Sequence, residues 1–239
     1  MHPCCELVSV ADTDAENLAF ASAAFDVPGY ATWDAMFAAQ AIDIAMAVLP
    51  VAANAAAVIA SAEARCRIEG VYDLRYGPGP LEVLDVYPAE AENAPVQFYI
   101  HGGYWRAQDK SDVSFLAEPF TAAGACVVII NYDLCPNASL PEIMAETVRA
   151  LIWTRENIAE WGGDPEQIFI SGNSAGAHLG AMLLARDWAA DGQPDDIIKG
   201  AALLTGVYDP TPVMGITVND AVRLTPDRIG AASPMLNLP

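Results

Sequence analysis

The stretch IFISGNSAG, residues 168–176, decides the fold of this chain of 239 residues. Its first three residues are apolar and predict a strand, and the helix-prone run 177–185 follows closely. Between the two stands Ser174, with the small residues Gly172 and Gly176 on either side, as a tight and strained turn requires. Because a strand, a tight turn and a helix form the setting of a nucleophile elbow, we predict that Ser174 is a catalytic nucleophile.

Apolar runs elsewhere in the chain alternate with segments of helical composition. Alternation of strands and helices is typical of an α/β fold with a mostly parallel sheet flanked by helices. Strands are expected at 81–87, 96–100, 126–131 and 201–205, and helices at about 113–123 and 141–161. No strand is expected after Thr205, so the fold is expected to lack its last strands and to end on a bare sheet edge.

The length and composition predict one large core preceded by a helical segment. We expect residues 1–70 to form an N-terminal helical segment packed on the core, and residues 71–239 to form a C-terminally incomplete α/β core. The apolar stretch 44–60 is similar in length to a membrane span, but it is mostly alanine and is interrupted by Pro50 and Asn54. A packed helix is therefore expected there, and no membrane partner.

The charge balance excludes some classes of partner. The chain has 31 Asp and Glu against 11 Lys and Arg, a net charge of −20, so it would repel nucleic acid and anionic lipid. Its five cysteines show no metal-ligand spacing, and residues 1–16 contain no lysine or arginine of a secretion signal. We expect a cytoplasmic protein without metal or cofactor, whose partner is a small molecule; a homo-oligomer is left open.

Acyl transfer needs a nucleophile, a base and hydrogen-bond donors aimed at the developing oxyanion. The backbone N–H of Ala175, directly after the nucleophile, is one expected donor. Gly102 and Gly103 follow the strand expected at 96–100 and are expected to supply another, because glycine allows a close approach of backbone to substrate. A Gly-x-Ser-x-Gly motif alone is weak evidence, but His-Gly-Gly upstream, after its own strand, makes the combination specific.

Two aromatic residues, Tyr104 and Trp105, follow the oxyanion glycines directly. They are candidates for a substrate-binding pocket that takes an aromatic acyl or leaving group. A role in the core is equally compatible with the sequence, and both interpretations stay open at this stage.

The general base is missing from its expected place. His178 is the one histidine after Ser174, and it lies one helical turn below the nucleophile on the same helix, so a structural role is expected. His101 is expected to brace the oxyanion loop, and Asp209 to serve in a turn after a strand. None of these residues is expected to complete a catalytic triad.

Four motifs together resemble the arylformamidase (kynurenine formamidase) group of α/β-hydrolases. They are HGGYW at 101–105, YDLCP at 132–136, SGNSAGAHL at 171–179 and GVYD at 206–209. The resemblance implies an α/β-hydrolase fold and a serine hydrolase that cleaves an aryl formamide, such as N-formylkynurenine, or a small carboxylic ester through an acyl-enzyme.

The same resemblance places the nucleophile on Ser174 and the oxyanion element on residues 101–103. Asn173 stands where relatives commonly carry histidine. The family's triad aspartate and histidine come after its two last strands, so they are expected beyond residue 239. The alternative interpretation is a non-catalytic, truncated pseudo-hydrolase or binding protein.

Overall fold

The computed structural model describes residues 10–11, 29–30 and 68–237. The chain divides into two compact units, residues 1–43 and 44–239. In the first unit, β1 (Val10–Ala11) pairs in parallel with β2 (Gly29–Tyr30). Nearly all of the N-terminal helical segment expected for residues 1–70, and the whole stretch 44–60, lie outside the described residues, so the expected domain boundary stays a prediction.

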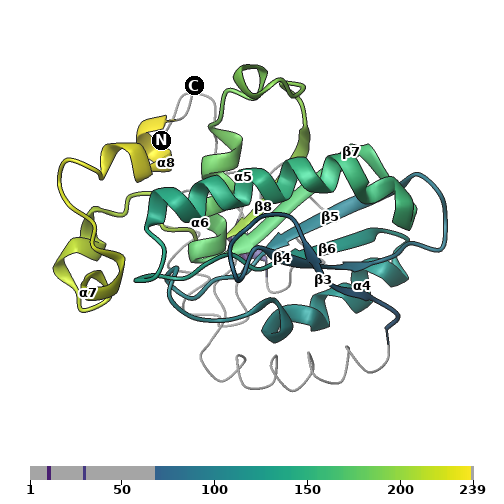
Figure 1. Ribbon diagram of the computed structural model, residues 1–239, viewed down its shortest axis with the longest axis horizontal. Coiled ribbons are helices and arrows are strands. Elements are labelled where there is room, and N and C mark those ends of the chain that lie inside the picture. The colour runs from purple at the N-terminus through teal and green to yellow at the C-terminus, as the bar shows by residue number, and fades with distance from the viewer. Residues whose placement is uncertain (1–9, 12–28, 31–67, 238–239) are drawn as a thin grey trace. The chain divides into compact units, whose positions relative to one another are not determined.

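The second unit is built on a six-stranded sheet with the order β3-β4-β6-β5-β7-β8 (Figure 1). The strands β5, β6, β7 and β8 run parallel to one another, whereas β4 pairs antiparallel with both β3 and β6. This arrangement confirms the mostly parallel sheet expected from the sequence. The strands are β3 (Val71–Arg75), β4 (Val83–Tyr87), β5 (Ala94–Ile100), β6 (Cys126–Ile130), β7 (Gly163–Asn173) and β8 (Ile198–Leu204).

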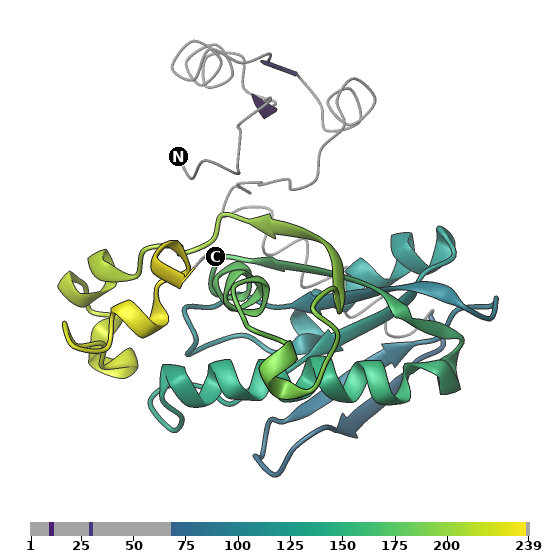
Figure 2. The ribbon, with the colours of Figure 1, turned by 90° about the horizontal axis from the view of Figure 1, so that it is seen from above.

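β8 is the outermost strand of this sheet, opposite the antiparallel pair β3 and β4 (Figure 2). It pairs with β7 along one edge, and within the described part of the chain no strand covers its other edge. The bare edge expected after Thr205 is therefore present among these residues. The strand itself starts at Ile198, three residues earlier than expected.

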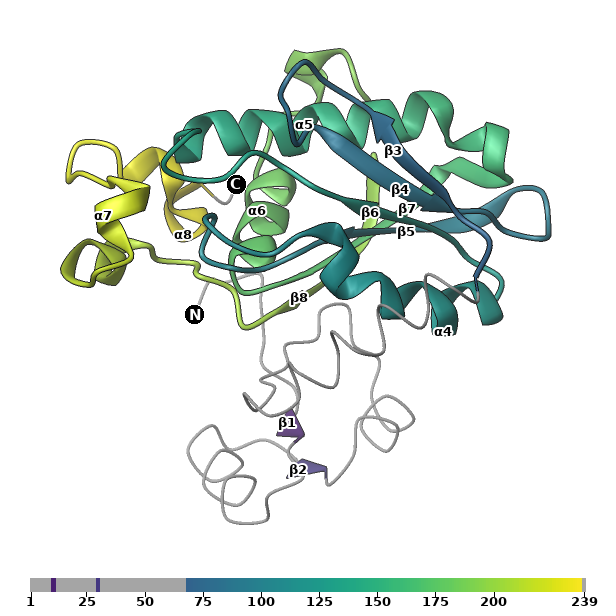
Figure 3. The same cartoon turned by 60° about the horizontal axis from the view of Figure 1, so that its bottom comes forward.

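Helices cover both faces of the sheet, with α5 on one side and α4 on the other (Figure 3). The smaller core lies between the sheet and α4. It contains Tyr87, Tyr99, Val113, Ala117, Val127 and Ile129. The larger core holds the alternate residues of the same strands, among them Phe98, Val128 and Ile170. All five residues of β6 are buried, as a continuous β-branched run in a central strand requires.

Helix boundaries follow local signals. α5 (Leu140–Asn157) begins after a capping box in which Ser139 and Glu142 satisfy each other's backbone, and η2 (Ile158–Trp161) ends at Gly162, whose φ is +80°. The helix expected at 113–123 is instead η1 (Lys110–Leu116) followed by α4 (Ala117–Ala122). The remaining helices are α6 (Ala175–Leu184), η3 (Ala189–Asp191), η4 (Thr211–Gly215), α7 (Asn219–Val222), η5 (Gly230–Ala232) and α8 (Pro234–Asn237).

The short helices from α7 to α8 lie together at one end of the sheet (Figures 1 and 3). None of the helices in the described ranges is both long and apolar enough to span a bilayer.

Candidate active site

Ser174 lies in a strained turn between β7 and α6. Its φ of +53° and ψ of −112° are rare for a residue with a side chain. A Cβ atom at position 176 would lie 2.0 Å from the Ile100 carbonyl oxygen, and one at 172 would lie 2.7 Å from the Gly176 backbone. Glycine is therefore required at both positions. The Ser174 N–H donates to the Leu204 carbonyl at 2.8 Å, which ties the turn to β8.

The His-Gly-Gly motif lies beside this turn. Ile100 at the end of β5 pairs with Gly172 at the end of β7, so the loops that leave the two parallel strands are neighbours. A Cβ atom at Gly102 would lie 2.8 Å from the Asn173 side-chain nitrogen, next to Ser174 in the chain. Gly103 has a φ of +100° and packs so tightly that a Cβ atom would lie 2.2 Å from the Ala107 carbonyl oxygen. The structure thus brings together the two motifs that the sequence singled out.

Tyr132 fixes the orientation of the glycine loop. Its hydroxyl donates to the carbonyls of His101 and Gly102 at 2.8 and 3.1 Å, and its ring stacks on the His101 ring with centroids 4.3 Å apart. In a trans peptide the N–H points away from the carbonyl, so the N–H groups of Gly102 and Gly103 point away from Tyr132. This role was not predicted, and its one signal in the sequence is the YDLCP motif, which contains the tyrosine.

His178 is a buried structural residue, as expected. Its Nδ1 accepts a hydrogen bond from the Trp105 indole at 3.2 Å, and its Nε2 lies 2.8 Å from the Ala232 carbonyl, so Nε2 carries the proton. Burial lowers the pKa of His178 to about 4. The ring is therefore neutral at pH 7, and it has no lone pair left for the proton of a serine hydroxyl.

His101 is also wholly buried. Its Nδ1 lies 2.9 Å from the Gly102 carbonyl, and burial lowers its pKa. Its packing against Tyr132 agrees with the expected bracing of the oxyanion loop. Asp209, by contrast, is exposed, and it accepts a hydrogen bond from the Thr211 N–H at 2.9 Å, which is the expected turn role.

The two aromatic candidates for substrate binding differ. Tyr104 is 40% exposed, whereas the Trp105 side chain is 0% exposed and bonded to His178. The expectation that Trp105 lines a substrate pocket is not supported, because a fully covered side chain offers no surface to a ligand. Trp105 takes the core role left open by the sequence, and its φ of +56° turns the chain at this point.

No group of three or more His, Cys, Asp and Glu side chains in the described ranges is placed to hold a metal ion.

Comparisons with known proteins agree with this fold. A family model described as alpha/beta hydrolase fold matches residues 97–233. The chain is 34% identical to a kynurenine formamidase of Danio rerio over 165 residues, which cover 68% of this chain and 54% of that protein. It is 40% identical to esterase LipQ of Mycobacterium tuberculosis over 152 residues, 58% of this chain and 36% of the esterase.

Among solved structures, EstE1, a thermophilic carboxylesterase cloned from a metagenomic library, shares the fold. The TM-score is 0.58 at 19% identity, and the match covers 79% of this chain and 73% of EstE1. The chain spans just over half the length of the kynurenine formamidases that it matches. It belongs to the α/β-hydrolase fold family, and within that family it is similar to the arylformamidases.

Proposed function

We propose that the protein is a serine hydrolase that cleaves an aryl formamide similar to N-formylkynurenine, or a small carboxylic ester, through an acyl-enzyme. The observation that carries this proposal is the strained backbone of Ser174 next to the Gly102 loop. A non-glycine residue in such a conformation costs about 1–3 kcal/mol, and such strain clusters at functional sites. Relatives that are formamidases and esterases support the reaction class.

In the proposed reaction the Ser174 hydroxyl attacks the carbonyl carbon of the formamide or ester. The N–H groups of Ala175 and of the Gly102-Gly103 loop donate to the oxyanion, and each such donor contributes about 3 kcal/mol to the transition state. Collapse of the tetrahedral intermediate breaks the bond to the amine or alcohol and leaves an acyl group on Ser174. Water then hydrolyses the acyl-enzyme.

Two residues take different parts in substrate binding under this proposal. The exposed ring of Tyr104, next to Gly103, contacts the aryl group or leaving group. The buried Trp105 anchors that loop to α6 through its hydrogen bond to His178. The group that accepts the Ser174 proton is not assigned, because His101 and His178 are both wholly buried within the described region.

The burial of these two histidines favours a second candidate function, a non-catalytic protein that binds a ligand without turning it over. Without an activating base a serine hydroxyl is a weak nucleophile. The oxyanion donors and binding alone still leave a residual acceleration of about 10³ to 10⁴ over water. For this chain we therefore expect reactivity at Ser174 with slow turnover.

A fluorophosphonate probe tests the assignment of the nucleophile. We expect the probe to label the protein at Ser174 and the Ser174→Ala variant to lose the label completely. Ser171→Ala is the matched control, because Ser171 lies three residues earlier in β7 and its hydroxyl is bonded to Gln97 at 2.6 Å. Undiminished labelling of Ser174→Ala would refute the proposal.

Hydrolysis of N-formylkynurenine and of p-nitrophenyl acetate separates the two candidate functions. Turnover of either compound that disappears in Ser174→Ala identifies a hydrolase. Binding of the compounds with no turnover in either protein identifies the binding protein instead.

A further inference from the structure

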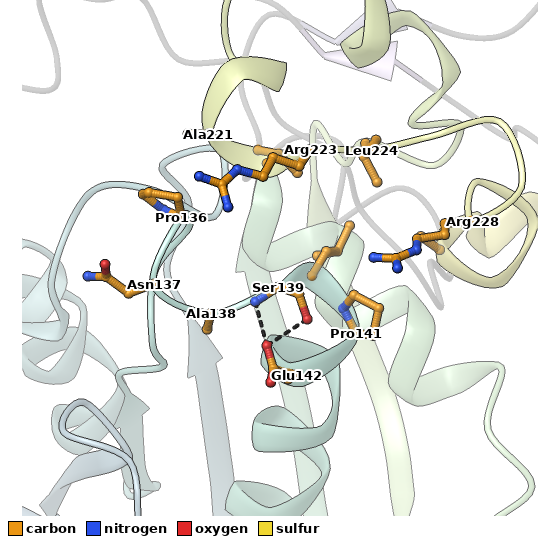
Figure 4. Close-up of a pocket in the computed structure, with 13 residues that line it drawn as sticks. Pro136, Asn137, Ala138, Ser139, Pro141, Glu142, Ala221, Arg223, Leu224 and Arg228 are labelled. Atoms are coloured by element: carbon orange, nitrogen blue, oxygen red, sulfur yellow. Dashed lines mark hydrogen bonds between the residues drawn. The ribbon is translucent and has the colours of Figure 1, made fainter.

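A pocket of about 280 Å³ lies where the start of α5 meets the segment around α7 and η5 (Figure 4). Its apolar lining includes the exposed Pro141 and the half-buried Ala221, with Leu140, Val222 and Leu224 packed almost fully buried around them. Two arginines, Arg223 and Arg228, are part of the same lining. In Figure 4 Arg223 lies across the pocket from the start of α5, and Arg228 lies at its side, next to Pro141. The pocket therefore combines an apolar floor with two cations.

These arginines are unusual for this acidic chain. Nine Lys and Arg residues lie in the described ranges, and five of them form ion pairs. Arg75 donates to a backbone carbonyl. For Arg106, Arg223 and Arg228 the described residues show no hydrogen bond or ion pair of the guanidinium group, although the charge of Arg228 acts on the neighbouring Asp227 carboxylate. Two of those three share one pocket, although the chain has 31 acidic side chains that could have paired with them.

The backbone that carries Arg223 is held in place. Arg223 has a φ of +57°, and its N–H donates to the Asn219 carbonyl at 2.8 Å. The Asn219 side chain bonds both backbone groups of Leu224, accepting from the N–H at 2.7 Å and donating to the carbonyl at 3.1 Å. The base of the Arg223 side chain is thus fixed above the pocket before any ligand arrives, which reduces the entropy lost on binding.

The acidic residue in the lining, Glu142, is already engaged. One of its carboxylate oxygens accepts hydrogen bonds from the Ser139 N–H and hydroxyl, both at 2.7 Å, in the capping box of α5. The two arginines outnumber this carboxylate, so the charged side chains of the lining sum to +1. The excess positive charge comes from the arginines and not from the capped helix end.

We propose that this pocket binds a small organic carboxylate with an apolar body. The carboxylate lies between the guanidinium groups of Arg223 and Arg228, and the aryl or short alkyl body lies on Pro141 and Ala221. Arginine pairs well with planar carboxylates. An apolar floor disfavours a fully hydrated anion such as inorganic phosphate, because phosphate would lose water there without gaining a partner. This inference does not depend on the reactivity of Ser174.

The pocket is close to α6, the helix that follows Ser174. Its carboxylate ligand is therefore either the substrate itself or a separate molecule. Ala232 lines the pocket, and its carbonyl bonds His178, four residues after Ser174 in α6. Measuring carboxylate binding before and after fluorophosphonate labelling of Ser174 distinguishes the two sources. A shared site loses affinity on labelling, whereas a separate site keeps it.

Titration calorimetry on the full chain tests the proposal, with benzoate, the neutral isostere benzamide and inorganic phosphate as probes. We expect benzoate to bind at least tenfold more tightly than benzamide or phosphate. Arg223→Gln and Arg228→Gln should each weaken benzoate binding about tenfold or more, since a hydrogen bond to a charged group contributes that much. Arg155→Gln is the control. Arg155 lies in the last turn of α5, about 20 Å along the helix from the residues at its start that line the pocket.

A variant expected to bind benzoate more tightly keeps the proposal testable if the arginine variants do not fold. Glu142→Gln keeps a capping side chain at α5 while removing the opposing charge, so benzoate should bind a few-fold more tightly. Equal affinities for benzoate and benzamide, no binding of benzoate, or unchanged binding in both arginine variants would overturn the proposal. Fluorophosphonate labelling of Ser174 in the same proteins reports separately on the proposed hydrolase function.

Discussion

Two groups of charged residues are bonded to the segment 131–133, which also contacts the loop that carries Gly102, and they are balanced in opposite ways. In the first, here called the Lys110 cluster, one lysine serves two carboxylates, with its ammonium 2.7 Å from Asp73 and 2.8 Å from Asp85. In the second, here called the Glu146 cluster, three carboxylates (Glu82, Asp133 and Glu146) have Arg149 as their cation. In the first the cation is buried, whereas in the second the cation is half-exposed and Glu82 and Glu146 are buried.

This difference appears in the pKa values. Burial lowers the pKa of Lys110, but its hydrogen bonds to the two aspartates outweigh burial and raise the pKa overall. Burial raises the pKa of Glu146 to about 7, with further contributions from Asp133 and Glu82. The Arg149 side chain is 42% exposed, so water screens its charge. Lys110 thus has a buried partner of opposite charge in Asp85, whereas the cation nearest Glu146 is half-exposed.

Removal of the enclosed cation should have the largest effect. In Lys110→Met the buried Asp85 and its neighbour Asp73 lose the ammonium that they share, and breaking a buried pair in this way costs about 3–5 kcal/mol. Urea denaturation at pH 7 measures the change in the free energy of unfolding. Lys199→Met provides the matched control, since Lys199 pairs with the exposed Asp196 and should change stability by less than about 1 kcal/mol. Similar losses in both variants would remove the distinction between enclosed and exposed cations.

The half-exposed cation of the Glu146 cluster should matter less. Arg149 donates to the buried Glu82 carboxylate through two nitrogens, each at 2.8 Å. Arg149→Gln leaves Glu82 its hydrogen bond from the Gly79 N–H, so a loss of about 2 kcal/mol is expected. The same urea titration measures it. A loss as large as that of Lys110→Met would contradict the comparison.

The smallest effect should be a pH dependence at Glu146. Its folded pKa of about 7 lies above the ordinary value of 4.5, so the folded protein binds more protons between these two values. The stability that this gives is complete below about pH 4.5 and is lost as the pH rises through about 7.

Glu146→Gln tests this dependence, because a glutamine oxygen can still accept the hydrogen bond from the Asp133 N–H. Relative to the unmodified chain, the variant should gain about 1 kcal/mol between pH 6 and pH 8. Thermal unfolding at several pH values gives the difference. A constant difference across that range would show that Glu146 does not titrate there.

The sequence predicted the elements whose signals are local. The buried run of β6 and the elbow at Ser174 are specified by neighbouring residues, and both are present. β3 was missed because Asp73, with a φ of +57°, interrupts a strand of five residues. The start of β7 at Gly163 was missed because Gly162 and Gly163 are typical of a turn.

Residues of the candidate site were predictable from the sequence only where they lie within one short motif. Ser174 and the Gly102-Gly103 pair lie in short patterns with a known backbone requirement. The bond between Trp105 and His178 joins residues 73 positions apart, and the pair Arg149 and Glu82 spans 67. No pattern in one sequence reports on such contacts, because they depend on how separate strands pack. For the same reason the sequence did not decide whether Trp105 is buried in the core or lines a pocket.

The residues after β6 connect these regions to one another. Asn131 accepts from the Lys110 N–H at 2.6 Å, Tyr132 bonds the loop carbonyls, and the Asp133 N–H donates to Glu146 at 2.7 Å. Side chains of an extended segment alternate between opposite sides, so a slip of β6 by one residue against β5 would turn the Asn131 and Tyr132 side chains to the opposite side and move the Asp133 N–H away from Glu146. The pairing of Ile130 with Ile100 therefore aligns the Gly102-Gly103 loop and both clusters at once, and strand registration acts as the alignment step for the candidate site.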